Sequence, residues 1–576
     1  MSAEQFIQQK AAAAIQAIYG TEVAETSLQV SVTRKEFEGD YTLVTFPLLK
    51  ITHQAPDATG NAIGEWLVSN VKEISAYNSV KGFLNLSFSP LYWNESLQAM
   101  AADPAFGQLP DTGRRIMVEF SSPNTNKPLH LGHIRNNLLG DSVARILKAC
   151  GNDVIKATLV NDRGVHICKS MYAWEKLFDG ATPESTGKKG DHLVGDCYVA
   201  YAKLEKEHPE VQEDVHKMLV DWEAGDPHVR ELWSMMNGWV FKGFDQTYKA
   251  LGISFDKVDY EHDTYLLGKE LVQKGLDMGV FVKDPDGSVW CDLTADGLDR
   301  KLVLRGDGTS VYITQDLGTA ERRFANYNLD SHVYVVGNEQ DYHFQVLKLI
   351  LKKLGFDWAD QIYHLSYGMV ELPEGKMKSR EGTVVDADDL IQSMYEEAKK
   401  TSEESGKLAD ISEDEREKLY HMIGLGALKY FIIKVDPKKT MLFNPKESID
   451  FNGNTGPFIQ YTHARICSIL RKATVAFGPS DINADVTPSA KEIRLTQLLS
   501  LYPAKVAEAG AALSPAVIAN YAYDLAKEFN QYYHDTPILK ESDEAVLKYR
   551  LALIALMASV LRTAMSLLGI ELPERM

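Results

Sequence analysis

The spacing of apolar residues gives the first part of the chain the character of a small mixed domain. Runs with apolar residues at every second position alternate with runs at helical spacing, beginning with an amphipathic stretch at the N-terminus. The strand-like runs are residues 28–34, 40–50 and 79–88. A turn-rich segment at 103–113 ends this stretch. We therefore expect an α+β domain over residues 1–110.

From Arg114 onward the pattern is typical of a parallel β-sheet. A buried strand at 114–120 is followed by a polar loop, a helix at 131–149 and a second strand at 153–160. The apolar face of the helix has helical spacing and consists of Ile134, Leu138, Val143, Ile146 and Leu147. This βαβ unit predicts parallel strands joined by a right-handed crossover.

A second unit of the same kind lies far downstream. It has a strand at 331–337, a helix at 341–355 and a strand at 361–370. Between the two units, the chain from about 165 to 300 is mostly helical and charged. We interpret this section as a helical insertion that splits an open α/β fold.

The last third of the chain has almost only helical patterns. After about residue 390 apolar residues recur at helical spacing up to the C-terminus. The fold class predicted is therefore α/β, with a split Rossmann-like catalytic domain at 111–450 and an all-α bundle at 451–576.

Composition limits the classes of function. The chain has 576 residues, a net charge of −19 and five cysteines without a CxxC pair, which argues against a disulfide framework and a cysteine-built zinc site. No run of eighteen apolar residues and no secretory signal is evident, so we expect a cytoplasmic protein without a membrane span. The acidic total alone argues against a nucleic-acid partner, but local basic surface decides such binding.

The stretch "NTNKPLHLGHIRNN" carries the first candidate chemistry. Its loop lies between the end of a strand and the start of a helix, where open parallel sheets bind ligands. A helix N-terminus favours phosphate, Gly132 permits close approach, and His130 and His133 are three residues apart. Donors placed there would stabilise charge that develops on an α-phosphate. The alternative is that both histidines are ordinary residues of a helix start.

A second candidate is the basic loop "GKMKSREGTVV" at 375–385. Lys376, Lys378 and Arg380 would compensate the charge of a leaving pyrophosphate. Taken alone, such a loop is more often a solvated turn. The chain has no GxxxxGK[ST] loop, so the two stretches together favour an adenylate-forming or nucleotidyl-transferring site.

The pair resembles the signature motifs of class I aminoacyl-tRNA synthetases. His130-Leu131-Gly132-His133 is similar to the HIGH motif, and the five residues from Lys376 to Arg380 are similar to the KMSKS loop. The blocks "SSPNTNKPLHLGHIRNNLLGDSVARIL", "VYITQDLGTAERRF" and "YGMVELPEGKMKSREGTVV" resemble the arginyl-tRNA synthetase family. The resemblance covers essentially the whole chain and is weakest over 165–300. It implies that arginine is activated with ATP and Mg²⁺ and then transferred to its tRNA, with no protein-bound metal.

The resemblance also implies roles for individual residues. A guanidinium presents five donors in a fixed fork, so its pocket needs carboxylates and other acceptors. The residues that match the family's arginine site are Glu119, Asn124, Asp263, Tyr312, Asp316 and Gln340. Within "DYEHDTY" the alternative to Asp263 is Glu261. The residues that match its ATP site are His130, Gly132, His133, Gly368, Met369, Val370, Lys376, Met377 and Arg380.

One position departs from the family pattern. The fourth residue of KMSKS is usually lysine, and here it is Ser379. The resemblance implies that Lys127, just before the first motif, shares phosphate stabilisation with Lys376. The catalytic residues expected are therefore His130, His133, Lys127 and Lys376.

The expected partners are arginine, ATP and tRNA, bound by a monomer. The residues expected to face tRNA are Tyr461, His463, Arg465 and Arg471, although a core position is equally compatible with Tyr461. Two other functions remain. A small-molecule adenylyl transferase would not need the terminal domains, and an inactive synthetase-like RNA-binding protein would not need an intact HIGH motif.

Overall fold

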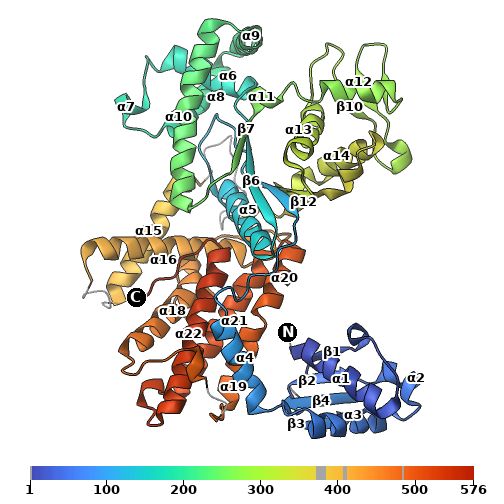
Figure 1. Ribbon diagram of the computed structural model, residues 1–576. Coiled ribbons are helices and arrows are strands. Elements are labelled where there is room, and N and C mark those ends of the chain that lie inside the picture. Colours follow the sequence, from blue (N-terminus) through green and yellow to red (C-terminus); the bar gives the residue numbers. More distant parts are fainter. Residues whose placement is uncertain (1–2, 35, 372–384, 406–410, 483–484) are drawn as a thin grey trace.

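A five-stranded parallel sheet forms the centre of the molecule (Figure 1). The computed structural model describes residues 3–34, 36–371, 385–405, 411–482 and 485–576. The strands of the sheet, in spatial order, are β12 (Ile362–Tyr367), β11 (Ser331–Gly337), β5 (Arg115–Glu119), β6 (Asp153–Val160) and β7 (Lys257–Tyr260). The chain leaves β5 first toward β6 and later returns on its other side with β11. A ligand crevice is expected at this reversal, at the carboxyl ends of β5 and β11.

Alternate residues of β5 point into two separate cores. Ile116 and Val118 pack with α5 (Leu131–Ala149), whereas Met117 packs with α13 (Tyr312–Tyr327) and α14 (Asp341–Lys353) on the other face. Both faces of the sheet are covered, which is why its central strands are continuous apolar runs. The predicted Rossmann-like sheet and its first helix are confirmed.

The section expected to be one helical insertion is only partly helical. Its first part, up to Leu251, is helical and consists of α6 (Val165–Leu177), α7 (Pro183–Thr186), α8 (Gly190–Glu207), α9 (Val211–Ala224) and α10 (Pro227–Leu251). The chain then returns to the main sheet as the edge strand β7, and Ala157 of β6 pairs with Lys257. Because β7 has four residues and two of them are charged, it gives no strand signal in the sequence.

A small antiparallel sheet follows β7. Its strands are β8 (Phe281–Lys283), β9 (Val289–Cys291) and β10 (Lys301–Leu304), and the helices before it are α11 (Glu261–Thr264) and α12 (Lys269–Asp277). This unit packs on α13 and lies at the upper right in Figure 1. The expectation of a single helical insertion over 165–300 is therefore wrong beyond Leu251.

The N-terminal domain has its own core. Its antiparallel sheet has the order β1 (Val30–Val32), β2 (Tyr41–Val44), β4 (Phe83–Phe88) and β3 (Ile74–Val80), and its helices are α1 (Ala3–Tyr19), α2 (Leu49–Thr52) and α3 (Pro56–Asn70). The single strand expected at 79–88 is a hairpin, because Lys81 and Gly82 have φ of 51° and 81° and turn the chain. The strand expected at 40–50 ends at Val44 and gives way to short helical turns.

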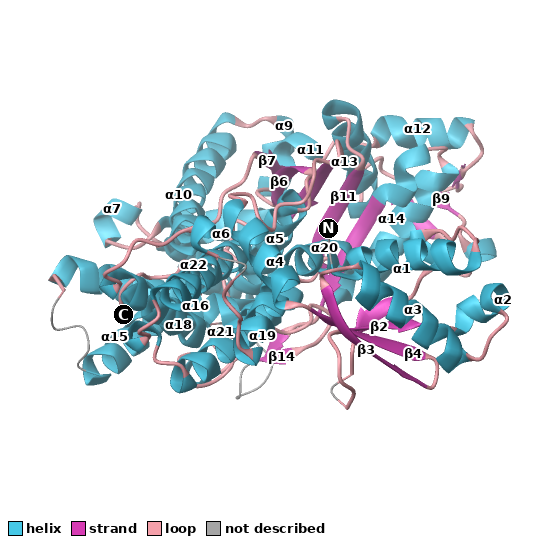
Figure 2. Cartoon of the chain, turned by 60° about the horizontal axis from the view of Figure 1, so that its bottom comes forward, coloured by secondary structure: helices cyan, strands magenta, loops and turns pink. Residues whose placement is uncertain are grey.

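The C-terminal part is a helical bundle, as predicted (Figure 2). Its helices are α15 (Ala387–Ser405), α16 (Glu413–Ile433), α17 (Pro445–Ser448), α18 (Gly456–Lys472), α19 (Ala490–Ser500), α20 (Tyr502–Ala512), α21 (Pro515–Asp535) and α22 (Glu544–Leu567). By length and composition α22 could cross a membrane, but 61% of its apolar window is buried in the protein. It packs against α4 (Pro90–Ala102), α5, α18, α19 and α21, as the core helix of a bundle does.

A buried ion triad fixes α13 to the central sheet. Arg323 of α13 is paired with Glu119 at the end of β5, and its Nη2 lies 2.9 Å from Oδ2 of Asp259 on β7. Burial opposes the charge of Arg323, but Glu119 and Asp259 raise its pKa above the usual range. The triad therefore joins three segments that are far apart in the sequence.

Removing the arginine should leave the buried Glu119 without its ion-pair partner, and Asp259 with Lys257 as its only remaining one among the described residues. We expect Arg323→Met to destabilise the catalytic part by about 3–5 kcal/mol, seen as a lowered thermal or denaturant midpoint. The neighbouring Arg322→Met is the matched control, because Arg322 is exposed on the same helix. It should change stability by less than about 0.5 kcal/mol. Equal losses in the two variants would contradict a structural role for the triad.

Candidate active site

The two histidines of the first motif cap the N-terminus of α5 reciprocally. His130 is the N-cap residue, and its Nδ1 accepts a hydrogen bond from the Gly132 N–H at 3.1 Å. The Nδ1 of His133 accepts from the His130 N–H at 3.2 Å. The two imidazole rings lie 3.9 Å apart between centroids. Both rings thus satisfy N–H groups that a helix start otherwise leaves without a partner.

This capping fixes the tautomer of both rings. Because each Nδ1 accepts a proton, the neutral ring carries its hydrogen on Nε2 and can donate it to a ligand. Burial, reinforced by Lys127, lowers the pKa of His130 to about 4. Burial also lowers the pKa of His133, with His130 and Lys127 acting in the same direction. At neutral pH the site therefore offers two neutral Nε2–H donors.

Gly132 makes room for the imidazole of His130. A Cβ at this position would lie 3.0 Å from Cε1 and 3.1 Å from Nδ1 of His130. The glycine therefore allows His130 to close over the helix start, which is an indirect contribution to ligand binding. The expected place of Gly132 in the ATP site stays a prediction.

A strained residue joins β5 to the loop before α5. Ser121 has a φ of 63°, in the left-handed region that side chains other than glycine rarely adopt. Its N–H donates to Oδ1 of Asn136 at 2.7 Å, its Oγ lies 2.7 Å from the Tyr248 hydroxyl, and its carbonyl accepts from Thr158. Three neighbouring elements thus hold this conformation. Nothing in the sequence singles out this serine.

Asn136 ties the start of α5 to the strands at the crevice. Besides accepting from Ser121, its Nδ2 donates to the Val335 carbonyl at 2.8 Å and to the Tyr367 hydroxyl at 3.1 Å. One amide therefore contacts the ends of β5, β11 and β12. Asn136 lies three positions after His133 on the same helix, but no motif or pattern in the sequence marks it.

A cavity of about 370 Å³ opens beside the first histidine. Its lining includes Asn124, Lys127 and His130 of the motif, together with residues of α6 and α8 and with Asp386. Burial lowers the pKa of Lys127, and a phosphate brought beside it would favour its charged form. Three of the expected site residues are thus brought together by the fold.

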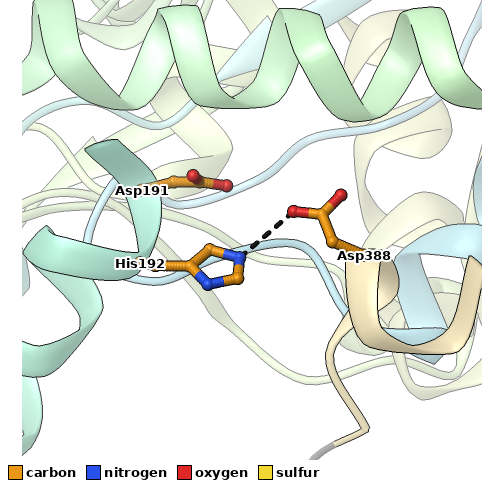
Figure 3. Close-up of side chains that lie close together, drawn as sticks. All are labelled: Asp191, His192 and Asp388. Carbon is orange, nitrogen blue, oxygen red and sulfur yellow. Dashed lines mark hydrogen bonds and ion pairs between the residues drawn. The ribbon is translucent and has the colours of Figure 1, made fainter. Parts of the chain in front are cut away.

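An ion network closes the far side of this cavity. The Nζ of Lys189 lies 2.6 Å from Asp388, 3.2 Å from Asp191 and 2.6 Å from the Thr247 hydroxyl. His192 contacts the same Asp388 at 3.1 Å (Figure 3). The network fixes the start of α15 to α8 and α10. In the sequence, α15 follows the basic loop at 375–385.

Three members of the network are close enough together to hold a metal ion. Ligand atoms of Asp191, His192 and Asp388 lie within 4.8 Å of one another. The Lys189 ammonium already neutralises both carboxylates, and the hydrogen bond that His192 donates to Asp388 raises the pKa of His192 against burial. A ring that favours its protonated form is a poor metal ligand. The cluster therefore fits a salt-bridge network better than a metal centre.

The backbone expected to bind adenine, at Gly368, Met369 and Val370, comes directly after β12. Gly368 lies between β12 and the short β13 (Val370–Glu371), which pairs in parallel with β14 (Met441–Leu442). A Cβ on Gly368 would lie 2.5 Å from the backbone of Lys439 and Thr440, so only glycine fits. The strand expected at 361–370 is therefore interrupted here. Lys376, Met377, Lys378, Ser379 and Arg380 lie outside the described residues.

The predicted arginine residues lie around α13. Tyr312 and Asp316 are one turn apart on this helix; Tyr312 is exposed, and Oδ2 of Asp316 is 2.6 Å from Nε2 of His343 on α14. His343, which the sequence analysis missed, orients this carboxylate. Asn124 is exposed within the loop between β5 and α5, and Gln340 is exposed in the short helical turn after β11.

Glu119 does not have the role expected of it. We expected its carboxylate to hold the amino-acid end, but it is buried and paired with Arg323. Burial raises its pKa and Arg323 opposes this shift. The carboxylate is therefore a structural anchor of α13 and is not exposed to a ligand.

The two acidic candidates of "DYEHDTY" lie on α11, which packs against α13. Gln315 donates to the Thr264 hydroxyl at 3.0 Å across this contact. Glu261 is buried, and burial, with Asp162 and Asp316 adding to it, raises its pKa to about 7. Asp263 has a 64% exposed side chain and lies 3.4 Å from His262. The exposed carboxylate of Asp263 can contact a guanidinium directly. The buried carboxyl of Glu261 can act on it only indirectly.

The residues expected to contact tRNA divide into two groups on α18. His463 is fully buried, and its Nδ1 lies 2.9 Å from the Pro573 carbonyl, so direct contact with RNA is excluded in this structure. Arg471 donates to the Glu574 carbonyl at 2.9 Å. Both residues hold the C-terminal tail. Tyr461 and Arg465 lie together, with the guanidinium 4.7 Å from the ring centroid.

A doubly wound sheet with paired histidines at its first helix start, followed by a helical bundle, defines the architecture of a class I aminoacyl-tRNA synthetase. The comparisons agree with this class. Residues 98–444 match the family "tRNA synthetases class I (R), catalytic domain", and residues 459–576 match the "DALR anticodon binding domain". The chain belongs to the arginyl-tRNA synthetase family.

Its relatives match over their whole length. The chain is 56% identical to the arginine–tRNA ligase of Bacteroides thetaiotaomicron over 98% of each chain. It is 54% identical to that of Phocaeicola vulgatus over 100% of each. The solved arginyl-tRNA synthetase of Thermus thermophilus superposes with a TM-score of 0.82 at 26% identity, covering 100% of both chains.

Loss of either imidazole donor should slow chemistry more than it weakens ATP binding. We expect His130→Ala and His133→Ala to lower kcat of adenylate formation by about 10²–10³-fold, with little change in KM for ATP. His130→Asn is the structural control, because its Oδ1 can still accept from the Gly132 N–H. It should fold as stably as the wild type while losing activity. A loss shared equally between kcat and ATP affinity would contradict the role.

The capped histidine should also make stability depend on pH. The pKa of His130 is about 4 in the folded protein and about 6.5 when unfolded. The unfolded chain thus binds the extra proton first, so this stabilisation is complete above pH 6.5 and is lost toward pH 4. The wild type and His130→Asn should therefore have similar Tm values at pH 7, and the Tm of the wild type should fall below that of the variant as pH falls to 4.5. A difference independent of pH would show that His130 is not buried in its neutral form.

Proposed function

We propose that this chain ligates arginine to its tRNA with ATP. The arginine carboxylate attacks the α-phosphorus of ATP, the bond to pyrophosphate breaks, and arginyl-adenylate forms. A ribose hydroxyl at the 3′ end of tRNA then attacks the activated carbonyl, and AMP leaves. The observation that carries the proposal is the pair of neutral Nε2–H donors at the N-terminus of α5, at the carboxyl end of the central sheet.

Adenylate formation increases negative charge around the α-phosphate. His130 and His133 would donate to this group, and the positive end of the α5 dipole acts in the same direction. Lys127 would compensate charge from the cavity side and Lys376 from the basic loop. The backbone at Gly368, Met369 and Val370 would hold adenine. Mg²⁺ would enter with ATP, bound to its phosphates.

Arginine recognition would combine charge with geometry. Asp316, oriented by His343, would receive the guanidinium, and the exposed Tyr312 and Asp263 would complete the pocket. Asn124 and Gln340 would hold the amino-acid end in place of the buried Glu119. A lysine side chain would leave some of these acceptors unpaired. The pocket would therefore reject lysine without an editing step.

The terminal domains would position the tRNA. We propose boundaries at residues 1–110, 111–450 and 451–576, with the first and last domains contacting RNA. Tyr461 and Arg465 form a half-buried pair that would stack on a base. The described cysteines are free thiols, which suits a monomer acting in the reducing cytoplasm.

Pyrophosphate exchange into ATP tests the proposal directly. It is measured with each of the twenty amino acids, with and without total tRNA. Exchange with arginine alone, and only when tRNA is present, is expected. Exchange with another amino acid would refute the guanidinium pocket around Asp316. Absence of exchange with all of them would favour an inactive RNA-binding protein or a small-molecule adenylyl transferase.

The two acids of α11 can be separated by matched substitutions. We expect Asp263→Asn to raise KM for arginine about 10–100-fold, because it removes a charge-assisted hydrogen bond worth about 1.5–3 kcal/mol. Glu261→Gln, on the same short helix, should raise it less, because this buried carboxyl is partly protonated at neutral pH. Both constants come from steady-state exchange at saturating ATP. A larger effect of Glu261→Gln would assign the contact to Glu261.

A further inference from the structure

A buried carboxyl beside the candidate arginine pocket has no partner. Glu261 is the first residue of α11, which lies against β7 and α13 (Figure 1). It is 8% exposed, and among the described residues its carboxyl has no hydrogen-bond or ion-pair partner. A carboxylate without a partner is costly to bury, so such a group keeps its proton unless a cation comes close to it. Glu261 can therefore exchange a proton for a neighbouring positive charge.

The charges that act on Glu261 leave it short of a positive neighbour. Two of them are carboxylates, Asp162 in the segment after β6 and Asp316 on α13. The one cation among them is Arg163, which is already paired with Glu223. Burial raises the pKa of Glu261 to about 7; Arg163 opposes this shift, and the two carboxylates add to it. At pH 7 the carboxyl is therefore protonated in about half of the molecules.

The other charged groups next to α11 are taken up by partners of their own. Asp162 lies 2.5 Å from Nδ1 of His262 and also accepts from the His262 N–H at 3.0 Å. Asp259 of β7 is paired with Arg323 and lies 3.3 Å from Nζ of Lys257. These groups leave no described cation free to neutralise Glu261.

The missing positive charge can come from the arginine pocket. Burial raises the pKa of Tyr312 on α13, and Glu261 and Asp316 act in the same direction, so both carboxylates act on one exposed hydroxyl. Asp316 is held by His343, and Asp263 lies on the same short helix as Glu261. Because Asp316 and Glu261 interact electrostatically, a guanidinium held by Asp316 would bring its positive charge close to Glu261.

We propose that arginine binding expels the proton of Glu261, which makes this residue a charge-sensing positioning residue of the pocket. The inference rests on the proposed function, which places the guanidinium on Asp316. In the empty pocket the proton limits the negative charge that is buried. When the guanidinium enters, the O–H bond of the Glu261 carboxyl breaks, the proton passes to solvent, and the carboxylate attracts the bound cation without contact. Arginine itself gains and loses no bond.

Calorimetric titration of L-arginine into the full chain, with tRNA present and ATP omitted, measures the expelled proton. The titration is repeated in buffers of different ionisation enthalpy. At pH 7 the wild type should release about 0.5 protons per arginine, because about half of the Glu261 carboxyls carry a proton beforehand. Since the deprotonated form binds better, the Kd for arginine should fall about five- to tenfold between pH 6 and pH 8.

Three variants assign the proton. Glu261→Gln should release none and should bind arginine with nearly the same affinity at pH 6 and pH 8. His262→Asn is the matched control on the same helix, because histidines also exchange protons near neutral pH and the Asn amide can still donate to Asp162. It should keep the release and the pH dependence. Arg163→Met removes the opposing cation and should move the midpoint of the pH dependence to higher pH.

The outcomes separate this inference from the proposed function. Failure of the wild type to exchange pyrophosphate with arginine would defeat the function, whatever the titrations show. An active wild type that releases no proton at pH 7 would overturn the role of Glu261. Release that persists in Glu261→Gln would also overturn it and would point to His343 beside Asp316. If Glu261→Gln does not fold, the midpoint in Arg163→Met decides, and an unshifted midpoint contradicts the inference.

Discussion

The reciprocal capping of α5 by His130 and His133 is the interaction on which the catalytic account depends. Each ring accepts a backbone N–H through Nδ1, so each must present Nε2–H outward and stay neutral. A charged imidazolium could not accept the same hydrogen bond. The capping of the helix start, the tautomer of both rings and their lowered pKa therefore depend on one another. Together they direct two hydrogen-bond donors and the helix dipole at one place.

Polar contacts far apart in the sequence hold that place rigid. Asn136 joins the ends of three strands to α5, and Arg323 joins α13 to β5 and β7. The Lys189 network fixes α15 to the helical region on the other side of the cavity. These contacts hold the start of α5, α13 and the start of α15 in place around the carboxyl ends of the central strands. Geometry of this kind is what transition-state stabilisation requires.

Much of this architecture is predictable from local patterns. The helix 131–149 and the strand 331–337 are visible because their apolar residues keep one period over many positions. The strand β7 is too short and too charged to give a period, and the turn at Lys81 depends on backbone angles. The Glu119–Arg323 pair joins residues 204 positions apart, so it reverses the expected role of Glu119 without any local signal. From the sequence alone, His463 is expected to be exposed because it is polar. Only the structure shows that the C-terminal tail covers it.

The most direct measurement of the central claim is a crystal structure with tRNA and a non-hydrolysable arginyl-adenylate analogue. The account predicts that the group replacing the phosphate lies within hydrogen-bond distance of Nε2 of both His130 and His133, with the guanidinium on Asp316. An analogue held through the Nδ1 atoms, or bound with its guanidinium away from α13, would contradict it.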